Sequence, residues 1–239
     1  MIEVIKSITN KVIFFLIGIF LFSFLLGWFL PIGIDKVDTL SYGEYLFSTY
    51  TVFTQFGFLM FSFIVAYFIN KEYSNKTILF YKLLSYNSLK FYLNKIFVLI
   101  CESFFILLSF LLIVSLIYGD FSLLFLMLFL LTFVMIQYIL IIGLISMLST
   151  NILISIGFSI FYWILSVVLV SLSDKFRYIA IFDASNELYD HVAKTIKRGE
   201  IFISMSDLMV ILTFIIIIFL ISVMVAKFMN KRWLKLGIN

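Results

Sequence analysis

The sequence predicts an all-α membrane protein that crosses the bilayer about six times, as a single transmembrane domain over residues 1–239. Of its 239 residues, 64% are hydrophobic and only 13% are charged, whereas soluble globular chains are about 45–50% apolar and about 25% charged. The apolar residues also form long runs. A chain of this size cannot bury so much apolar surface in a water-soluble fold, so we expect lipid to solvate most of it.

Six apolar runs of roughly 19 to 28 residues are the expected transmembrane helices, and the only charge well inside one of them is Glu102, since Lys227 is the penultimate residue of the sixth run. At about 1.5 Å per helical residue, the shortest run reaches about 28 Å, close to the hydrocarbon thickness of about 30 Å. A membrane β-barrel would instead show segments of about ten residues with alternating polarity. The runs span residues 12–30, 47–69, 96–118, 121–148, 152–172 and 208–228.

The distribution of lysine and arginine predicts which helix ends face the cytoplasm. Eleven of these residues lie before the first run, between the second and third runs, or at and after the end of the sixth, and six lie on the other side. Cytoplasmic loops of membrane proteins carry an excess of lysine and arginine. We therefore expect both termini and the 70–95 loop in the cytoplasm, and the 173–206 loop outside the cell.

Three segments outside the runs carry helical signals. Residues 1–11 place apolar side chains every three or four positions, which favours an amphipathic helix at the membrane interface over a disordered basic start. In the cytoplasmic loop, residues 75–86 contain no glycine or proline and favour a helix. In the external loop, apolar residues repeat at intervals of four and stop before Gly199, which predicts an amphipathic external helix.

The sequence offers no chemistry for an enzyme or a metal site. It has no Gly-Lys-Ser/Thr phosphate-binding loop, so this chain cannot hydrolyse ATP by itself. Its single histidine, His191, excludes zinc motifs that need two histidines, and a serine–histidine triad is not expected in the external loop. The single cysteine, Cys101, lies in an apolar run and is expected to pack as a small hydrophobe. We therefore expect no catalytic residue, metal or cofactor on this chain.

Glu102 is the one charged residue well inside the apolar runs. It follows Lys95 by seven residues, so it should lie roughly 10 Å in from the cytoplasmic helix end. A carboxylate at that depth costs several kcal/mol unless it is paired or protonated. We expect an intramembrane ion pair with a lysine of the cytoplasmic loop or the N-terminal helix. The alternatives are a carboxylate facing a shallow water-filled vestibule and, less favoured, a proton carrier.

Polar and aromatic side chains within the runs are candidates for lining a substrate cavity. Such residues also hydrogen-bond between helices or sit at membrane interfaces, and for any one of them that is the stronger interpretation. The candidates are Tyr50, Thr54, Gln55, Gln137, Tyr162 and Trp163.

The cytoplasmic loop resembles the segment after the second helix of type-2 ABC exporter permeases. That family pattern has a glutamate, a threonine about five residues later, a Leu-Leu pair, a small-basic dipeptide and a lysine that opens the third helix. Two positions depart from it: Lys76 stands where glycine is common, and Asn87 stands where proline is common. The matching positions are Glu72, Thr77, Leu83, Leu84, Lys90 and Lys95.

This resemblance implies a fold and a mechanism. The fold would be the type-2 exporter topology, with a cytoplasmic coupling helix after the second span and an external helix between spans five and six. The chain would be a permease subunit in a bacterial cell membrane, paired with an identical or sister permease. Two copies of a separate ABC ATPase would carry the ATP and Mg²⁺. The residues implied to couple to that ATPase are Glu72, Asn75, Lys76, Thr77, Phe80, Tyr81, Lys82 and Leu84.

The small size and the 31 phenylalanines are similar to those of permeases that remove membrane-active peptides, as in bacteriocin self-immunity or peptide toxin export. Export of lipids, polysaccharide or drugs is the other possibility within the family. Two interpretations lie outside it. A secondary transporter or channel would need ion-coupling groups at the bilayer midplane or an internal repeat, and we find neither in the sequence. A non-transporting assembly factor is the third interpretation.

Overall fold

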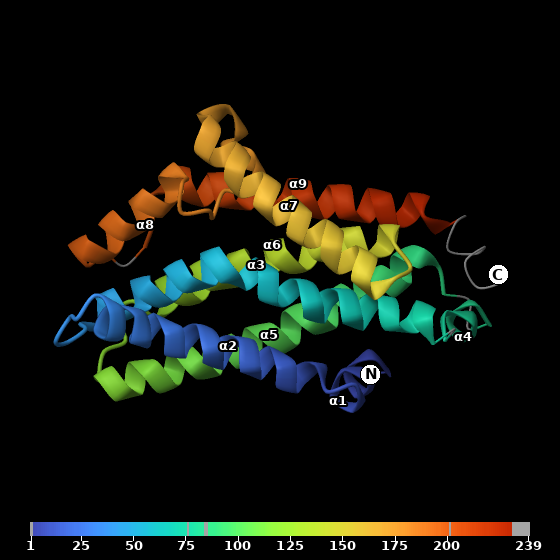
Figure 1. Cartoon of the computed structure of the whole chain (residues 1–239), viewed down its shortest axis with the longest axis horizontal. Coiled ribbons are helices and arrows are strands. Elements are labelled where there is room, and N and C mark those ends of the chain that lie inside the picture. Colours follow the sequence, from blue (N-terminus) through green and yellow to red (C-terminus); the bar gives the residue numbers. More distant parts are fainter. Residues whose placement is uncertain (1, 76, 84–85, 201, 231–239) are drawn as a thin grey trace.

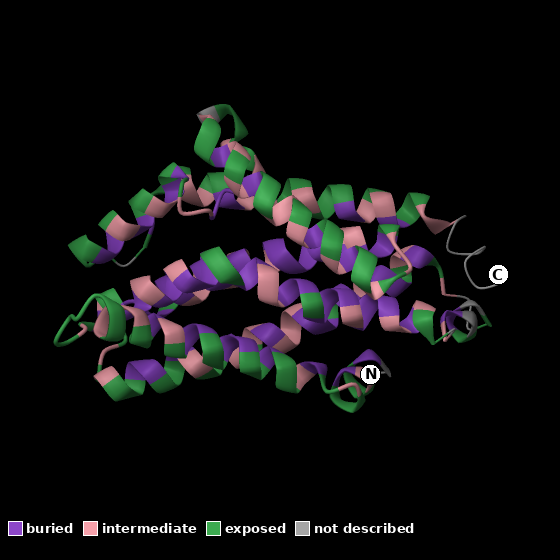
Figure 2. Ribbon diagram, in the orientation of Figure 1, coloured by how far each residue is buried: buried purple, intermediate pink, exposed green. Residues whose placement is uncertain are grey.

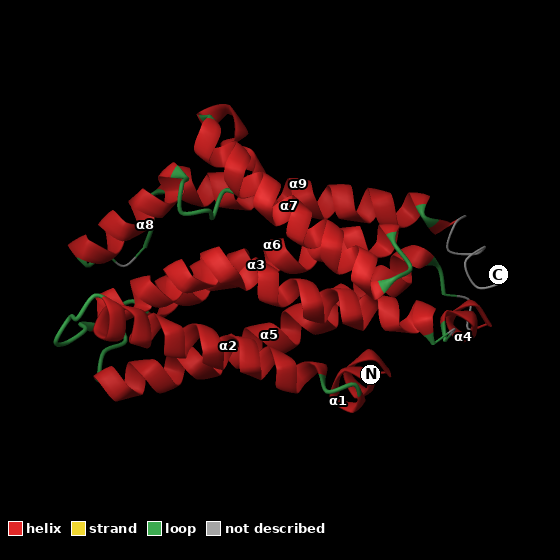
Figure 3. Ribbon diagram, in the orientation of Figure 1, coloured by secondary structure: helices red, strands yellow, loops and turns green. Residues whose placement is uncertain are grey.

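The computed structural model describes residues 2–75, 77–83, 86–200 and 202–230, and in these residues it is helical, without strands (Figure 3). Six helices in this part are long and apolar enough to cross a membrane. They are α2 (Val12–Phe29, continued by the π-helical turn η1, Leu30–Ile34), α3 (Tyr42–Ser74), α5 (Ser88–Tyr118), α6 (Leu124–Leu148), α7 (Ile152–Leu172) and α9 (Met205–Phe228). The shorter elements are α1 (Ile2–Thr9), α4 (Ile78–Leu83), the 3-10 turn η2 (Asp174–Ile179) and α8 (Glu187–Arg198).

Helix α3 is longer at both ends than the apolar run 47–69. Its start is set by a capping box, in which the Ser41 Oγ accepts from the Glu44 backbone N–H at 3.3 Å and the Ser41 N–H donates to the Glu44 carboxylate at 2.9 Å. Helix α5 likewise begins well before residue 96, because the Asn87 side chain accepts from the Lys90 N–H at 2.7 Å. Hydrophobicity marks the part in lipid, whereas caps decide where a helix ends.

The predicted 70–95 loop is therefore shorter in the structure. Helix α3 continues to Ser74 and α5 begins at Ser88, so the connection between them is residues 75–87, which contains α4. The external helix predicted in the 173–206 loop is α8, capped by the Asn186 side chain and ended by Gly199 at a φ of +66°.

Helices α3 and α6 form the centre of the bundle. Helix α3 packs against α2, α6 and α7, and α6 packs against α5, α7 and α9. These two helices contain more of the described buried residues than any other pair. In contrast, residues of α7 and α9 are exposed along much of their length (Figure 2), and many of them are aliphatic or aromatic. Exposed apolar helix faces are what lipid solvates, so the burial pattern is that of a polytopic membrane protein.

The two ends of the bundle carry different elements. Helices α1 and α4 and the last turn of α9 lie at one end, and α8 lies at the other (Figure 1). Helix α1 is separated from α2 by a sharp bend, where Lys11 has a φ of +60°. The bend folds α1 against the starts of α2 and α5. The N-terminal helix and the segment with α4 therefore meet at the same end.

Helices α2 and α3 approach closely at Gly27. A Cβ atom at this position would overlap the Thr49 side chain and lie 2.7 Å from the Thr49 Cα and 2.9 Å from its N. Backbone atoms cannot move aside as a flexible side chain can, so this contact requires glycine. Small residues at helix crossings let membrane helices approach in this way.

Candidate functional site

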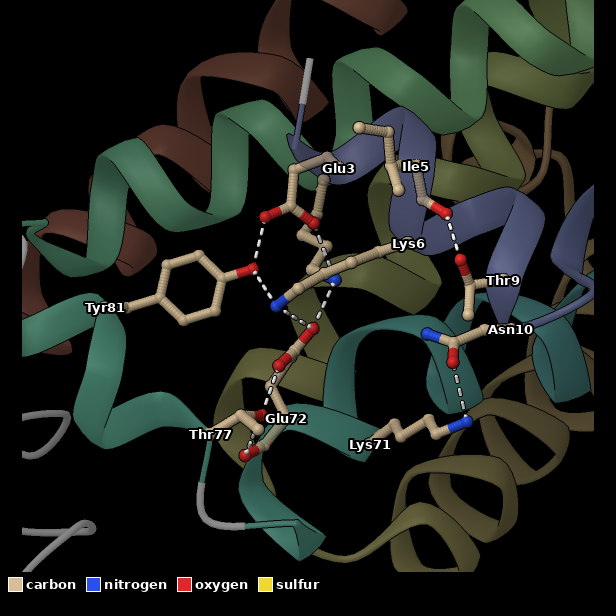
Figure 4. A network of polar contacts seen from close by, with 10 residues as sticks. Glu3, Ile5, Lys6, Thr9, Asn10, Lys71, Glu72, Thr77 and Tyr81 are labelled. Carbon is tan, nitrogen blue, oxygen red and sulfur yellow. Dashed lines mark hydrogen bonds and ion pairs between the residues drawn. The ribbon is translucent and has the colours of Figure 1, made fainter.

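A cluster of buried charges joins three helices at the end of the bundle that carries α1 and α4 (Figure 4). The Lys95 ammonium on α5 lies 2.8 Å from Glu3 Oε2 on α1 and 3.0 Å from Glu72 Oε1 on α3. The Lys6 ammonium on α1 lies 2.9 Å from the same Glu72 oxygen. We call these four residues, Glu3, Lys6, Glu72 and Lys95, the charge cluster.

Pairing makes the burial of these charges tolerable. Lys95 is fully buried, Glu3 and Glu72 are nearly so, and Lys6 is half-buried. Two carboxylates and two ammonium groups leave the cluster without net charge. The Lys95 ammonium also lies 3.9 Å from the centre of the Phe68 ring, an additional cation–π contact. An unpaired charge in this place would cost several kcal/mol, so each member depends on the others.

Two side chains fasten helix α4 to the charge cluster, one within the helix and one just before it. The Tyr81 hydroxyl donates to the Glu3 carboxylate and accepts from the Lys6 ammonium at 2.8 Å. The Thr77 hydroxyl donates to the Glu72 carboxylate. Burial, together with the neighbouring Glu3 carboxylate, raises the pKa of Tyr81 well above its ordinary value. The hydroxyl therefore remains a donor at any physiological pH.

Helix α1 has further anchors beside the charge cluster. The Ser7 hydroxyl donates to Glu102 Oε2 on α5 at 2.5 Å, and the Lys71 ammonium on α3 donates to the Asn10 side chain at 2.8 Å. The apolar Ile5 and Ile8 point away from these contacts and are exposed. Helix α1 therefore turns its polar face to the protein and its apolar face outward, as the interfacial helix predicted for residues 1–11 would.

The ion pair predicted for Glu102 is not formed with any residue that the structure describes. Among those residues its hydrogen-bond partner is the Ser7 hydroxyl, and its Oε1 is buried without one. Ser7 lies on the N-terminal helix, one of the two elements from which a partner was expected, but its group is a hydroxyl and not the ammonium of a lysine. Lys6 and Lys95 are already bound by Glu3 and Glu72, closer to the helix ends.

Replacing Glu102 by glutamine is therefore expected to change the free energy of unfolding by less than about 1 kcal/mol, because an amide oxygen can still accept from Ser7. Ser7→Ala should cost more, about 1–3 kcal/mol, because it removes the described donor from a buried carboxylate. Thermal unfolding of the two variants in one detergent makes the comparison. A larger loss in Glu102→Gln than in Ser7→Ala would show that Glu102 has an ionic partner after all.

The residues predicted to couple to an ATPase separate into two groups. Glu72, Thr77 and Tyr81 point into the charge cluster. In contrast, the side chain of Phe80 is 66% exposed, and that of Leu83, three residues later in α4, is 80% exposed. The remaining four are placed as follows: Asn75 caps the end of α3, Lys82 is in α4, and Lys76 and Leu84 lie outside the described residues.

Sequence reasoning missed Glu3 and Lys6 as members of this site. Their spacing of three residues places both on one face of a short helix, opposite to Ile5 and Ile8. In a membrane protein that polar face turns inward, so the spacing was a usable signal. What the sequence could not show is which of the many lysines and glutamates on that side would meet.

The six candidate cavity residues do not line one substrate cavity. Four of them, Thr54, Gln137, Tyr162 and Trp163, border a space of about 20 Å³, which holds a single water at most. Tyr50 is fully buried against Tyr189, with ring centres 6.0 Å apart, and Gln55 is exposed on the outside of α3. These side chains mainly pack between helices or face lipid.

A much larger cavity, of about 940 Å³, lies between α6, α7 and α9 under the turn η2. Its walls are mostly aliphatic, and of the six candidates only Tyr162 borders it. In the part of the chain that the structure describes, no three His, Cys, Asp or Glu side chains gather as a metal site would require. Side chains from each helix that line the cavity include Ile141, Ile145, Leu165, Leu169, Phe214 and Ile218.

The chain is similar over nearly its whole length to one described family. The family model described as "Peptide export permease protein YydJ family" matches residues 1–238. The chain is 48% identical over 234 residues to the Bacillus subtilis (strain 168) protein named "Probable peptide export permease protein YydJ", and the match covers 98% of each chain. No solved structure matches the chain.

Proposed function

We propose that this chain, which belongs to the peptide export permease protein YydJ family, is the permease subunit of an exporter that moves peptides out of the membrane or cell. It is a transport subunit rather than an enzyme. Its energy would come from a separate ABC ATPase, which binds the ATP and Mg²⁺, because this sequence has no phosphate-binding loop. Its peptides would be membrane-active ones, exported as toxins or removed for self-immunity.

The shape and anchoring of α4 carry the coupling part of this proposal. Its exposed Phe80 and Leu83 form a small apolar surface at the end of the bundle. Tyr81 of α4 and the preceding Thr77 are hydrogen-bonded to the charge cluster, which connects α4 to α1, α3 and α5. A force applied to the exposed surface would thus reach two transmembrane helices through short, buried polar contacts.

The proposed complex contains two permease chains and two ATPase copies in a bacterial plasma membrane. The second permease would be identical to this chain or a sister chain. Both termini and α4 would face the cytoplasm, where ATP is available. The excess of lysine and arginine on that side supports this orientation, and α1 and α4 lie at the same end of the bundle.

The test is to purify the full chain gently from its native membrane and identify the proteins that bind it in stoichiometric amounts. We expect an ATPase with a Walker motif. Replacing both Phe80 and Leu83 by aspartate should reduce its recovery at least tenfold, because charges would occupy an apolar contact. Phe121→Asp is the matched control: Phe121 is also exposed but lies in the turn between α5 and α6 at the opposite end.

Two results would contradict the proposal. One is a native complex that contains no ATPase in several mild detergents. The other is an ATPase that stays bound to the Phe80→Asp, Leu83→Asp variant as firmly as to the Phe121→Asp control. Equal thermal stability of the three proteins is required for the comparison, and it is expected because all three side chains are exposed.

A further inference from the structure

The large cavity is placed within the depth of the membrane. Along α9 its lining runs from Met209 to Ile221, about 18 Å at 1.5 Å per residue. That is more than half of a hydrocarbon layer of about 30 Å. Its lining residues Leu165 and Ile217 are themselves 41% and 50% exposed, so the cavity is open toward lipid between α7 and α9.

The walls of the cavity suit an apolar occupant. The hydroxyls of two lining residues are already used, since Tyr162 donates to the Ile179 carbonyl at 2.9 Å and Ser166 donates to the Trp163 carbonyl at 2.8 Å. Thr213 and Tyr178 add two more hydroxyls, and the Tyr178 hydroxyl accepts from Arg177 at 2.8 Å. A polar group carried deep into this space would lose its water with little compensation. Aliphatic side chains make no hydrogen bonds to water, so they would lose none on entering the cavity.

One end of the cavity meets a small polar pocket. Tyr178 and Val210 line both spaces, and the second has a volume of about 70 Å³, room for roughly two waters at about 30 Å³ each. Two carboxylates line it, Asp207 at 2.9 Å from His191 Nδ1 and Glu187 at 3.1 Å from Arg177. Apart from His191, the pocket is lined by two carboxylates and one guanidinium, that of Arg177, and this excess of negative charge favours a small cation.

We propose that this cavity binds the aliphatic face of an exported peptide, which enters from the lipid between α7 and α9 and places a basic side chain in the pocket beside Asp207 and Glu187. The proposal rests on the peptide export function proposed above. A phospholipid could fill the apolar part with an acyl chain. Its phosphate-bearing headgroup would not fit about 70 Å³ and would bring negative charge toward two carboxylates.

The experiment measures binding of a fluorescent model peptide to the full chain in phosphatidylcholine nanodiscs, with empty nanodiscs as the blank. The probe is a helical 12-residue Leu–Ala peptide with one terminal lysine, and its partner probe ends in glutamate. We expect the lysine peptide to bind at least tenfold more tightly than the glutamate peptide. Asp207→Asn should remove most of that preference, because it removes one of the two carboxylates that line the polar pocket.

A pair of neighbouring residues tests the cavity itself. Ile217 lines the cavity and Ile216 does not, although both are about equally exposed, at 50% and 57%. Ile217→Trp should fill the cavity and weaken peptide binding at least tenfold, whereas Ile216→Trp should leave it unchanged. Equal binding by the two variants would overturn the proposal. So would equal binding of the two peptides to the unmodified chain.

Other occupants give distinct results. If a phospholipid acyl chain fills the cavity, neither peptide will bind above the blank, and less phospholipid will copurify with Ile217→Trp than with Ile216→Trp. If a second copy of the chain fills it, Ile217→Trp will dissociate the oligomer. Either result overturns the proposal. Peptide binding needs no ATPase, so the expected pattern without a bound ATPase would support this site while contradicting the coupling proposal.

Discussion

Replacing Lys95 by methionine is expected to lower the free energy of unfolding by about 3–5 kcal/mol, the usual cost of removing one partner from a buried ionic group. Methionine fills a similar volume, so the loss is mainly electrostatic. Lys95 is fully buried between Glu3 and Glu72. Without it, Lys6 still pairs with Glu72, but Glu3 keeps only the Tyr81 hydroxyl among its described side-chain partners.

Thermal or denaturant unfolding of the purified chain measures this effect, and Lys71→Met is the matched control. The Lys71 ammonium binds the Asn10 side chain at 2.8 Å and the Tyr67 hydroxyl at 2.6 Å, with no carboxylate among its described partners. Losing these neutral partners should cost only about 0.5–1.5 kcal/mol. Equal losses in Lys71→Met and Lys95→Met would mean that the ion pairs of the charge cluster stabilise the fold no more than hydrogen bonds to neutral groups do.

A second variant separates the charge effect from a general packing defect. Adding Glu3→Gln to Lys95→Met removes the carboxylate that the first change leaves without its ammonium. The double variant should therefore be less destabilised than the sum of the two single variants, by about 0.5–3 kcal/mol. Strictly additive losses would show that Glu3 and Lys95 do not interact. We also expect Lys95→Met to impair transport, because the cluster fastens α4 to α1 and α3.

Gly27→Ala is the second large effect, and it is expected to destabilise the chain by about 1–3 kcal/mol through overpacking. The added methyl group would overlap Thr49 and lie 2.7 Å from its Cα, so α2 and α3 must move apart. That shift would also strain the hydrogen bond from the Tyr45 hydroxyl to the Phe24 carbonyl, 3.0 Å long, which joins the same two helices.

Gly18→Ala provides the opposite expectation on the same helix. Apart from its chain neighbours and the backbone of its own helix, no described atom lies within 4 Å of a Cβ placed at Gly18. Alanine is a better helix former than glycine by about 0.8–1.0 kcal/mol, so this change should be neutral or slightly stabilising. Unfolding midpoints of the two variants, measured side by side in one detergent, decide the matter. If both changes shift the midpoint in the same direction, the close approach of α2 and α3 at Gly27 is not a constraint.

The transmembrane architecture was largely predictable from the sequence. The length and polarity of an apolar run are local properties of the chain, and lipid selects for them directly. All six predicted runs accordingly lie within, or nearly coincide with, long helices of the structure. Helix α8 was also predictable, because its periodicity, its Asn186 cap and its terminal Gly199 are all local signals.

The helix ends around α4 were less predictable. The run 47–69 ended five residues before α3 does, and the helix predicted from residue 75 begins at Ile78 as α4, whose other end borders residues 84–85, outside the described part of the chain. Helix ends depend on caps and on contacts with other elements, which hydrophobicity does not record. Contacts between helices also decide which side chains share a cavity, and the sequence does not record them. The six polar and aromatic candidates were therefore grouped as one cavity, although Gln55 and Tyr50 lie on different sides of α3.

The sequence by itself determined that this chain is a helical membrane protein, because that conclusion follows from local composition. Only the tertiary structure decided which charges pair. Lys6 meets Glu72 across 66 positions, and Ser7 meets Glu102 across 95. Such partners are chosen by the packing of whole helices. A buried charge binds the nearest opposite charge that the packing brings to it, wherever that residue stands in the chain.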